Sequence, residues 1–191
     1  MIAQLRGKLI EKNPTEVVID CNGVGYAVKI SLNTFSSLGN DEAIMLFTKF
    51  IVREDAQILY GFNDKIEREM FEHLISVSGI GPNTAMIMLS SLIPSEIAAA
   101  IQQEDVPVIQ SIKGIGAKTA QRVIIDLKDK MLKMNISSEN LFASNNTNRF
   151  DALTALISLG FDKKTAEKAL DKVDTGDNEV EELIKKALKI L

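Results

Sequence analysis

Residues 77–92 read VSGIGPNTAMIMLSSL, and residues 112–127 repeat the same pattern as IKGIGAKTAQRVIIDL. Each copy runs from the end of a helix through Gly-Ile-Gly into a second helix that opens with x-x-Thr-Ala. A repeat of this kind predicts one helical domain built from two similar helix-hairpin-helix units. We refer to residues 77–84 as the first hairpin and to residues 112–119 as the second hairpin.

The repeated glycines favour a site for DNA phosphates. Glycine permits a tight turn with positive φ and has no side chain to block a ligand. The helix that follows begins with unpaired backbone N–H groups at its positive end, where a phosphate binds without reading the bases. The isoleucines between the glycines are expected to anchor the turns in the core. The predicted phosphate-binding residues are Gly79, Ile80, Gly81, Asn83 and Thr84 in the first copy, and Lys113, Gly114, Ile115, Gly116, Lys118, Thr119 and Arg122 in the second.

Other glycine motifs do not match the repeat. Ala117 separates Gly116 from Lys118, so the G-K-[ST] ending of a P-loop is absent. Threonine stands where a dinucleotide fingerprint needs its third glycine, and neither copy follows a strand. We therefore expect no ATP site and no cofactor. An ordinary tight turn between helices is the simpler alternative, but two copies in matching context, one of them basic, favour phosphate binding.

The local charge is more informative than the net charge of −4. Residues 113–133 hold six basic and two acidic residues, which is the only candidate footprint for a polyanion. One histidine and one cysteine offer no metal-ligand cluster, so no metal is expected. The unpaired Cys21, with no signal peptide and no apolar run of about 18 residues, predicts a cytoplasmic protein that does not enter a membrane.

The predicted fold class is α+β with several domains. Residues 1–64 alternate turn sequences with segments rich in branched and aromatic residues, and about five strands in this length fit a small closed barrel. Apolar residues at helical spacing occupy residues 65–134, the tandem hairpin domain. The Asn- and Ser-rich stretch 135–149 predicts a flexible linker, and residues 150–191 predict three short amphipathic helices.

An acidic pair interrupts the strand-like stretch VREDAQILYGF at residues 52–62. The pair, Glu54 and Asp55, is predicted to lie on a turn between two strands, and we call it the acidic turn. From these residues alone, solvated charges without a specific role are the simpler interpretation.

The chain resembles the RuvA family of bacterial proteins, which bind Holliday junctions and work with the RuvB motor. The similar segments follow the family's order and are MIAQLRGKLIEK, GVGYAV, FTKFIVREDAQILYGF, SGIGP and KGIGAKTAQRVIIDLKDK. The resemblance implies an oligonucleotide-binding (OB) fold barrel, a tandem helix-hairpin-helix domain and a mobile, UBA-like three-helix domain. Two positions depart from the family pattern, because lysine is usual where this chain has Asn83 and Ala117.

The resemblance also implies a function and partners. A homotetramer, or a face-to-face octamer, would hold a four-way junction open and position RuvB for branch migration in recombination and repair. RuvC resolvase would join a larger complex. The acidic turn would act as a pin that repels phosphates at the junction centre. RuvB would contact apolar residues left exposed by the C-terminal helices, for which the candidates are Leu156, Leu159, Phe161, Leu170 and Leu183.

The chain is expected to be non-catalytic, with the ATPase in RuvB. A DNA glycosylase or nuclease is the first alternative, but the sequence has no metal-spaced carboxylate cluster, no Trp and only two Tyr for a base pocket. Asp126 and Asp129 follow the second hairpin, where pairing with neighbouring lysines on a helix surface is the simpler interpretation. The second alternative is a duplex-binding or protein-interaction adaptor without junction preference.

Overall fold

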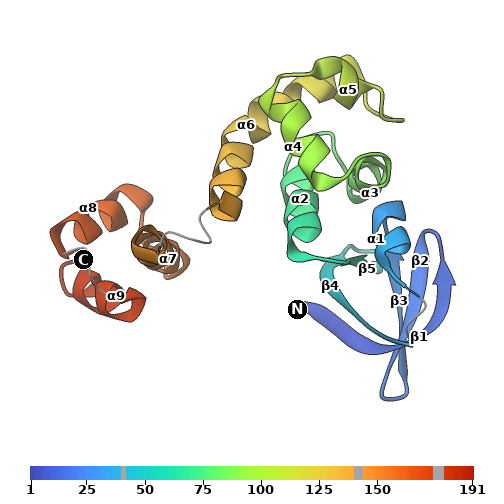
Figure 1. Cartoon of the computed structure of the whole chain (residues 1–191), viewed down its shortest axis with the longest axis horizontal. Helices are drawn as coiled ribbons and strands as arrows, with labels where there is room; N and C mark the ends of the chain where they lie inside the picture. Colours follow the sequence, from blue (N-terminus) through green and yellow to red (C-terminus); the bar gives the residue numbers. More distant parts are fainter. Residues whose placement is uncertain (40–41, 140–143, 174–178) are drawn as a thin grey trace. The chain divides into compact units, whose positions relative to one another are not determined.

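The computed structural model describes residues 1–39, 42–139, 144–173 and 179–191, leaving aside the side chains of residues 132–147 and 150. The chain divides into two compact units, residues 1–132 and 133–191. Figure 1 labels the elements, which are β1 (Gln4–Asn13), β2 (Glu16–Cys21), β3 (Val24–Ile30), α1 (Leu32–Ser37), β4 (Ala43–Val52), β5 (Gln57–Phe62), α2 (Lys65–Ile75), α3 (Pro82–Ser91), α4 (Pro94–Gln102), α5 (Val106–Gln110), α6 (Ala117–Glu139), α7 (Ser144–Ser158), α8 (Lys163–Val173) and α9 (Val180–Leu188).

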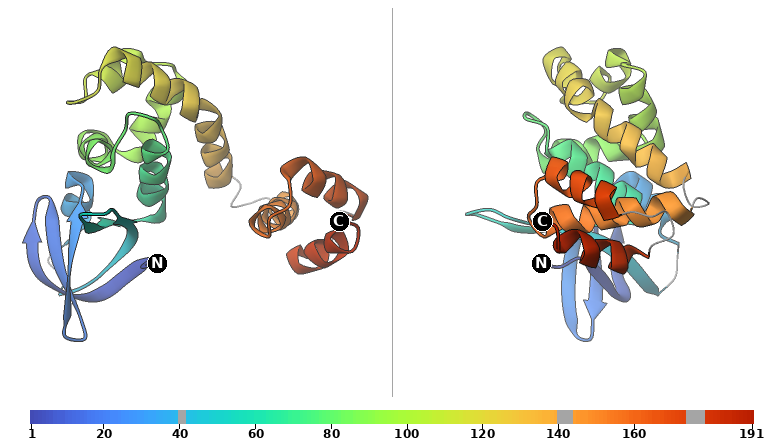
Figure 2. Two further views of the ribbon diagram at one scale, coloured as in Figure 1. Left: turned by 180° about the vertical axis from the view of Figure 1, so that it is seen from behind. Right: turned by 90° about the vertical axis from the view of Figure 1, so that its left-hand side faces the viewer.

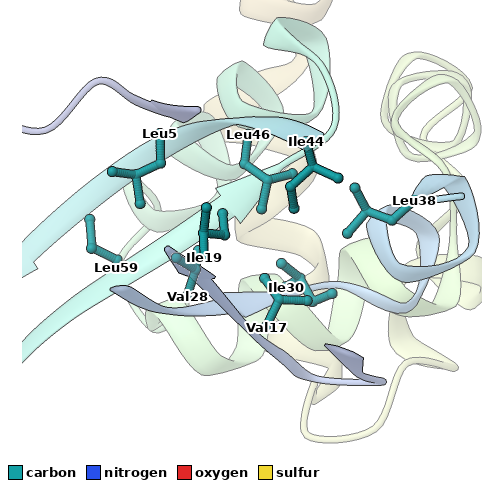
Figure 3. Packing of buried hydrophobic residues seen from close by; sticks show 9 residues of the cluster. All are labelled: Leu5, Val17, Ile19, Val28, Ile30, Leu38, Ile44, Leu46 and Leu59. Atoms are coloured by element: carbon teal, nitrogen blue, oxygen red, sulfur yellow. The ribbon is translucent and has the colours of Figure 1, made fainter. Parts of the chain in front are cut away.

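The five strands close into a barrel in the order β1-β2-β3-β5-β4, which confirms the predicted architecture. Neighbouring strands are antiparallel except β3 and β5, which run parallel. Alternate side chains point inward, as the two-residue period of a strand requires. Figure 3 shows the resulting aliphatic core of Leu5, Val17, Ile19, Val28, Ile30, Leu38, Ile44, Leu46 and Leu59.

The helices of the first unit pack directly on the barrel. Phe71 of α2 contacts the rings of Tyr60 and Phe62 on β5, with centroid distances of 5.1 and 5.0 Å. The short helix α1, which the sequence did not predict, binds α3 through a hydrogen bond from Asn33 Nδ2 to the carbonyl of Leu89. The barrel and the two hairpins therefore belong to one packed unit.

Membrane-spanning character is weak in the described helices. No single one is long and apolar enough to cross a membrane; α3 and α4 reach such a composition only together, as a pair bent by 97°. Both of these helices contribute buried side chains to the first unit.

The predicted linker at residues 135–149 is helical at both ends. Residues 135–139 continue α6 and residues 144–149 begin α7, so the stretch predicted as a flexible linker has helical ends. The remaining residues, 140–143, lie outside the described part of the chain. These ends can be helical despite their composition, because Asn and Ser each lower helix stability by less than about 0.7 kcal/mol, which an adjoining helix can tolerate. A tethering role for this stretch stays a prediction.

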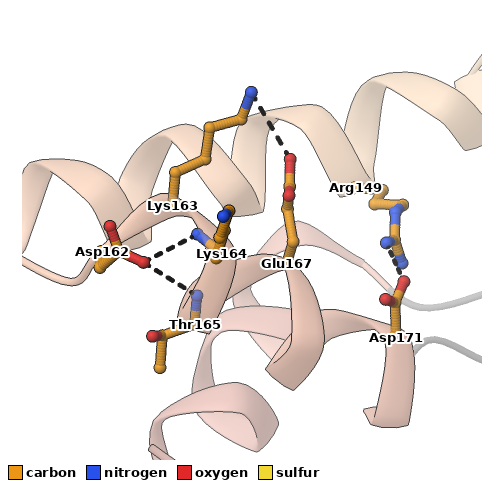
Figure 4. A network of polar contacts seen from close by, with 7 residues as sticks. All are labelled: Arg149, Asp162, Lys163, Lys164, Thr165, Glu167 and Asp171. Atoms are coloured by element: carbon orange, nitrogen blue, oxygen red, sulfur yellow. Dashed lines mark hydrogen bonds and ion pairs between the residues drawn. The ribbon is translucent and has the colours of Figure 1, made fainter.

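The second unit contains the three predicted helices α7, α8 and α9. Its core is small and uses alanine and leucine for close helix packing: Ala152, Leu156, Ala166, Ala169, Leu170, Leu183 and Ala187. Asp162 caps α8 by accepting hydrogen bonds from the backbone N–H of Lys164 (3.1 Å) and Thr165 (3.4 Å), while Arg149 of α7 pairs with Asp171 of α8 (Figure 4). Polar contacts thus supplement a core that is limited in size.

Candidate nucleic-acid interface

The first hairpin connects α2 to α3 by a turn that only glycine adopts easily. Gly79 has φ of 97°, a left-handed value that a side chain would strain. The turn closes with a hydrogen bond of 3.0 Å from the N–H of Ile80 to the carbonyl of Val77. Ile80 is buried, as predicted for the residue between the glycines. Gly81 ends the turn and precedes α3.

The second hairpin connects α5 to α6 with the same geometry. Gly114 has φ of 91°, and the N–H of Ile115 donates to the carbonyl of Ile112 at 3.1 Å. Ile115 is buried like its counterpart in the first hairpin. The sequence repeat is therefore also a repeat of backbone structure.

Both following helices present open backbone N–H groups. No side chain caps α3, whose preceding residue is Gly81, and in the second hairpin Gly116 has no side chain with which to cap α6. A side chain added at either glycine would meet no heavy atom within 4 Å, so the approach to these helix ends is clear. Such ends suit a phosphate group.

The structure brings the two hairpins into contact. A Cβ atom at Gly79 would lie 3.8 Å from the side chain of Thr119 in the second hairpin. Arg122 of α6 donates a hydrogen bond of 3.4 Å to the carbonyl of Ser78 in the first. The hairpins, 35 residues apart in the chain, thus form one surface.

Positive charge on this surface comes from the second hairpin and the first turns of α6. Lys113, Lys118 and Arg122 are exposed, and Lys118 and Arg122 line a hollow of about 330 Å³ on α6 together with the acidic residue Asp126. At the position equivalent to Lys118, the first hairpin has Asn83, whose Oδ1 accepts a 3.5 Å hydrogen bond from the Tyr60 hydroxyl. The first hairpin therefore offers backbone N–H groups, and the second adds cations.

The acidic turn lies at the tip of the β4–β5 hairpin, which projects from the barrel (Figure 2, right). The N–H of Arg53 closes the turn by donating to the carbonyl of Ala56 at 2.8 Å. Glu54 and Asp55 are both exposed, and neither has an ion-pair partner among the described residues. Two uncompensated carboxylates therefore face solvent in the same unit as the hairpins.

A buried polar network, which the sequence did not predict, joins the barrel to α2. The Glu67 carboxylate is 3% exposed and accepts hydrogen bonds from the hydroxyls of Ser31 and Thr34. It also accepts a 3.3 Å bond from the N–H of Asn63. Burial raises the pKa of Glu67, and Asp64 adds to that effect, while the three hydrogen bonds oppose it. The spacing Asp64-x-x-Glu67 signals a helix cap in the sequence, but the two hydroxyls that bind the Glu67 carboxylate come from residues remote in the chain.

The predicted contact surface for RuvB needs correction. Three of its five residues, Leu156, Leu170 and Leu183, are buried in the core of the second unit, so they are not available to a partner. Their helical spacing reflects packing within the unit. Of the five predicted contact residues, Leu159 is 61% exposed and Phe161 is half-buried.

Asp126 and Asp129 were expected to pair with Lys128, Lys130 and Lys133; the first two lysines pair elsewhere, and the side chain of Lys133 lies outside the described residues. Lys128 binds Glu104, and Lys130 binds the Ser76 hydroxyl at 3.2 Å. Both aspartates are exposed, and the described part of the chain holds no group of metal-ligating side chains. His73 lies 3.7 Å from Glu69 on the same helix.

Three family models match successive parts of the chain. The RuvA N terminal domain matches residues 1–61, the SAM-like helix-hairpin-helix tandem matches residues 71–129, and the RuvA C-terminal domain matches residues 147–191. Proteins named Holliday junction branch migration complex subunit RuvA from Christiangramia forsetii and Flavobacterium psychrophilum are each 55% identical, over 100% of both chains. The one from Bacteroides fragilis is 45% identical, again over the full length of both. The chain therefore belongs to the RuvA family.

Proposed function

We propose that this protein binds four-way DNA junctions as a subunit of a branch migration complex, in line with the name that its relatives carry. The observation that carries the proposal is the combination, in one unit, of two touching hairpins with open N–H groups and a protruding acidic turn. The hairpins attract phosphates of the arms, and the acidic turn repels phosphates at the crossover.

The junction is held by four copies of the chain in this proposal, which places eight carboxylates at its centre. Unit charges about 4 Å apart interact by about 4 kcal/mol at an effective dielectric of about 20, and by about 1 kcal/mol in bulk water. Salt screening over about 8 Å moves a wet site toward the lower figure. Repulsion summed over four copies still disfavours a duplex that crosses the centre.

The subunit itself is non-catalytic in this proposal, and the ATPase is the RuvB motor. The second unit recruits RuvB through exposed apolar residues such as Leu159, and the tether at residues 135–149 gives it reach. RuvC resolvase joins a larger complex on the same junction. Incubation with junction DNA should therefore release neither cut strands nor free bases.

The deciding experiment is a paired titration of the wild type and the Glu54→Gln, Asp55→Asn variant against four-way and linear DNA at one salt concentration. The variant should bind both shapes more tightly and lose its preference for four-way DNA. Glu11→Gln with Glu16→Gln removes the same charge from exposed barrel positions and should leave the preference unchanged. A wild type without preference for four-way DNA would contradict the function itself.

The number of subunits is measured separately. Light scattering with and without junction DNA should give a mass of four chains, or of eight when two tetramers enclose the junction. A monomer in both conditions would rule out the central ring of carboxylates.

A further inference from the structure

Glu67 lies where the barrel meets α2, the helix that leads to the first hairpin. We call this boundary, formed by the ends of β3 and β5 and the start of α2, the joint. The Glu67 carboxylate is bound by two hydroxyls and one backbone N–H, and no basic side chain pairs with it among the described residues. Ser31 and Thr34, which donate those hydroxyls, are fully buried. Such a buried carboxylate is stable only while its neutral donors keep their positions, because no other group compensates for its lost hydration.

The donors come from two different exits of the barrel. Ser31 directly follows β3, and Asn63 directly follows β5. These two strands form the parallel pair of the barrel, with Ile30 opposite Gly61. The chain therefore leaves the barrel at the same end after each of them. Glu67, in the first turn of α2, binds both exits at once and fixes the direction in which α2 starts.

This direction sets the distance between the two parts of the proposed DNA site. On one side of the joint, β5 leads back to the acidic turn over six residues, or about 20 Å. On the other side, α2 leads to the first hairpin over eleven residues. A small rotation at Glu67 would therefore move the acidic turn relative to the hairpins.

The other polar contacts between the barrel and α2 are more exposed than the Glu67 network, while the buried rings of Phe71, Tyr60 and Phe62 add apolar packing that does not depend on hydrogen-bond geometry. Lys49 pairs with Glu72 at 2.7 Å, but both side chains are partly exposed, at 28% and 41%. Arg68 donates to the carbonyl of Ala3 at 3.2 Å from an exposed position. Solvent competes for such pairs, so they tolerate rearrangement that the buried network does not.

We propose that Glu67 is a positioning residue that sets the preference for four-way over linear DNA, by holding the acidic turn at a defined distance from the hairpins. The inference rests on the proposed function. It requires that loosening the joint changes the preference between DNA shapes, while each hairpin keeps its own phosphate contacts.

The test compares Glu67→Ala, Glu67→Gln and Thr34→Val with Glu69→Ala, a matched control whose carboxylate is about half exposed on the same helix. The ratio of Kd values for linear and four-way DNA is measured at one salt concentration. Glu67→Ala should lower this ratio about tenfold, with linear binding unchanged within about twofold. Thr34→Val and Glu67→Gln should lie between that variant and the wild type, and the control should match the wild type.

A distance measurement tests positioning directly. Spin labels at Gln57→Cys and Ser91→Cys, in a Cys21→Ser background, report the separation of the β4–β5 hairpin and α3 without DNA. Thr34→Val or Glu67→Gln should broaden or shift this distance, which keeps the test valid even when Glu67→Ala does not fold. An unchanged distance and an unchanged ratio in these two folded variants would overturn the inference. A wild type with no preference would instead contradict the proposed function.

Discussion

Arg122 contributes to the hairpin surface in two ways. Its guanidinium is exposed beside the second hairpin and also donates to the carbonyl of Ser78 in the first. That contact is long, at 3.4 Å, and uses only one of the five guanidinium N–H groups. The others are therefore available to a phosphate. Lys118 lies one turn earlier on the same helix, so the two cations form a pair on α6.

The double variant Lys118→Ala, Arg122→Ala should weaken binding to DNA of every shape. For each phosphate that the variant no longer neutralises, the slope of log affinity against log salt should become less negative by about 0.9. The slope should therefore change by up to about 1.8. The measurement is a salt series of binding titrations. Lys163→Ala with Lys185→Ala removes the same charge from the second unit and should not alter the slope; a double variant on α6 with the wild-type slope would show that these cations contact no phosphate.

Glu67 should give the first unit a distinctive dependence on pH. Because burial raises its pKa above the ordinary value of about 4.3, the folded protein keeps a proton that the unfolded chain has already released. Its contribution to the free energy of unfolding therefore falls as pH rises between these two pKa values. Glu67→Gln removes that titration, so whatever the variant loses in hydrogen bonding, the difference in unfolding free energy between it and the wild type should move in its favour as pH rises across this window, with a limiting slope of about 1.4 kcal/mol per pH unit.

Urea unfolding at a series of pH values measures this difference. The chain has no Trp, and both Tyr residues, Tyr26 and Tyr60, lie on barrel strands, so tyrosine fluorescence reports on the first unit alone. Parallel curves of unfolding free energy against pH for the two proteins would show that Glu67 titrates normally.

At the scale of the element, the two glycines of each hairpin have different tasks. Gly114 has positive φ, whereas Gly116 does not, and an added Cβ would meet no heavy atom at either position. A methyl group at Gly114 would therefore strain only the backbone. A methyl group at Gly116 would fit the protein but obstruct the approach of a phosphate to the start of α6.

Alanine substitutions should separate these tasks. Gly114→Ala should lower the free energy of unfolding of the first unit by about 1–2 kcal/mol. Gly116→Ala should change it by less than about 1 kcal/mol, since alanine restricts the unfolded chain but is less favourable than glycine directly before a helix, and yet should weaken DNA binding. Urea unfolding and DNA titration of both variants check this; normal DNA binding by Gly116→Ala would argue against close phosphate contact at the second hairpin.

At the scale of the whole molecule, DNA binding and motor recruitment should be separable. A chain that ends at Glu139 keeps all of α6 and the whole first unit. It should bind four-way DNA within about twofold of the wild type and fail to stimulate RuvB-driven branch migration. Both are measured on one junction substrate, and a truncated chain that still stimulates migration would place the recruiting surface in the first unit.

A point substitution in the full chain refines this prediction. Leu159→Asp should keep the second unit folded, because that side chain is 61% exposed, but should reduce stimulation of RuvB. Leu156→Asp would instead unfold the unit, since Leu156 is fully buried. Circular dichroism distinguishes a folded variant that no longer binds RuvB from an unfolded one.

The sequence by itself determined those features that depend on neighbouring residues. The Gly-Ile-Gly turns, the buried Ile80 and Ile115 and the alternation of the barrel strands follow from local backbone preferences and from the periods of helix and strand. The resemblance to the RuvA family extended this local information to the order of the three domains.

Only the tertiary structure decided what depends on residues far apart in the chain. The Glu67 carboxylate binds hydroxyls that lie 33 and 36 positions earlier in the chain, and Arg122 next to the second hairpin contacts Ser78 in the first. The burial of Leu156, Leu170 and Leu183 was also undecided, because apolar residues at helical spacing look alike whether they meet another helix of their own unit or a partner. Periodicity identifies the apolar face of a helix, whereas the folding of the whole chain selects what that face contacts.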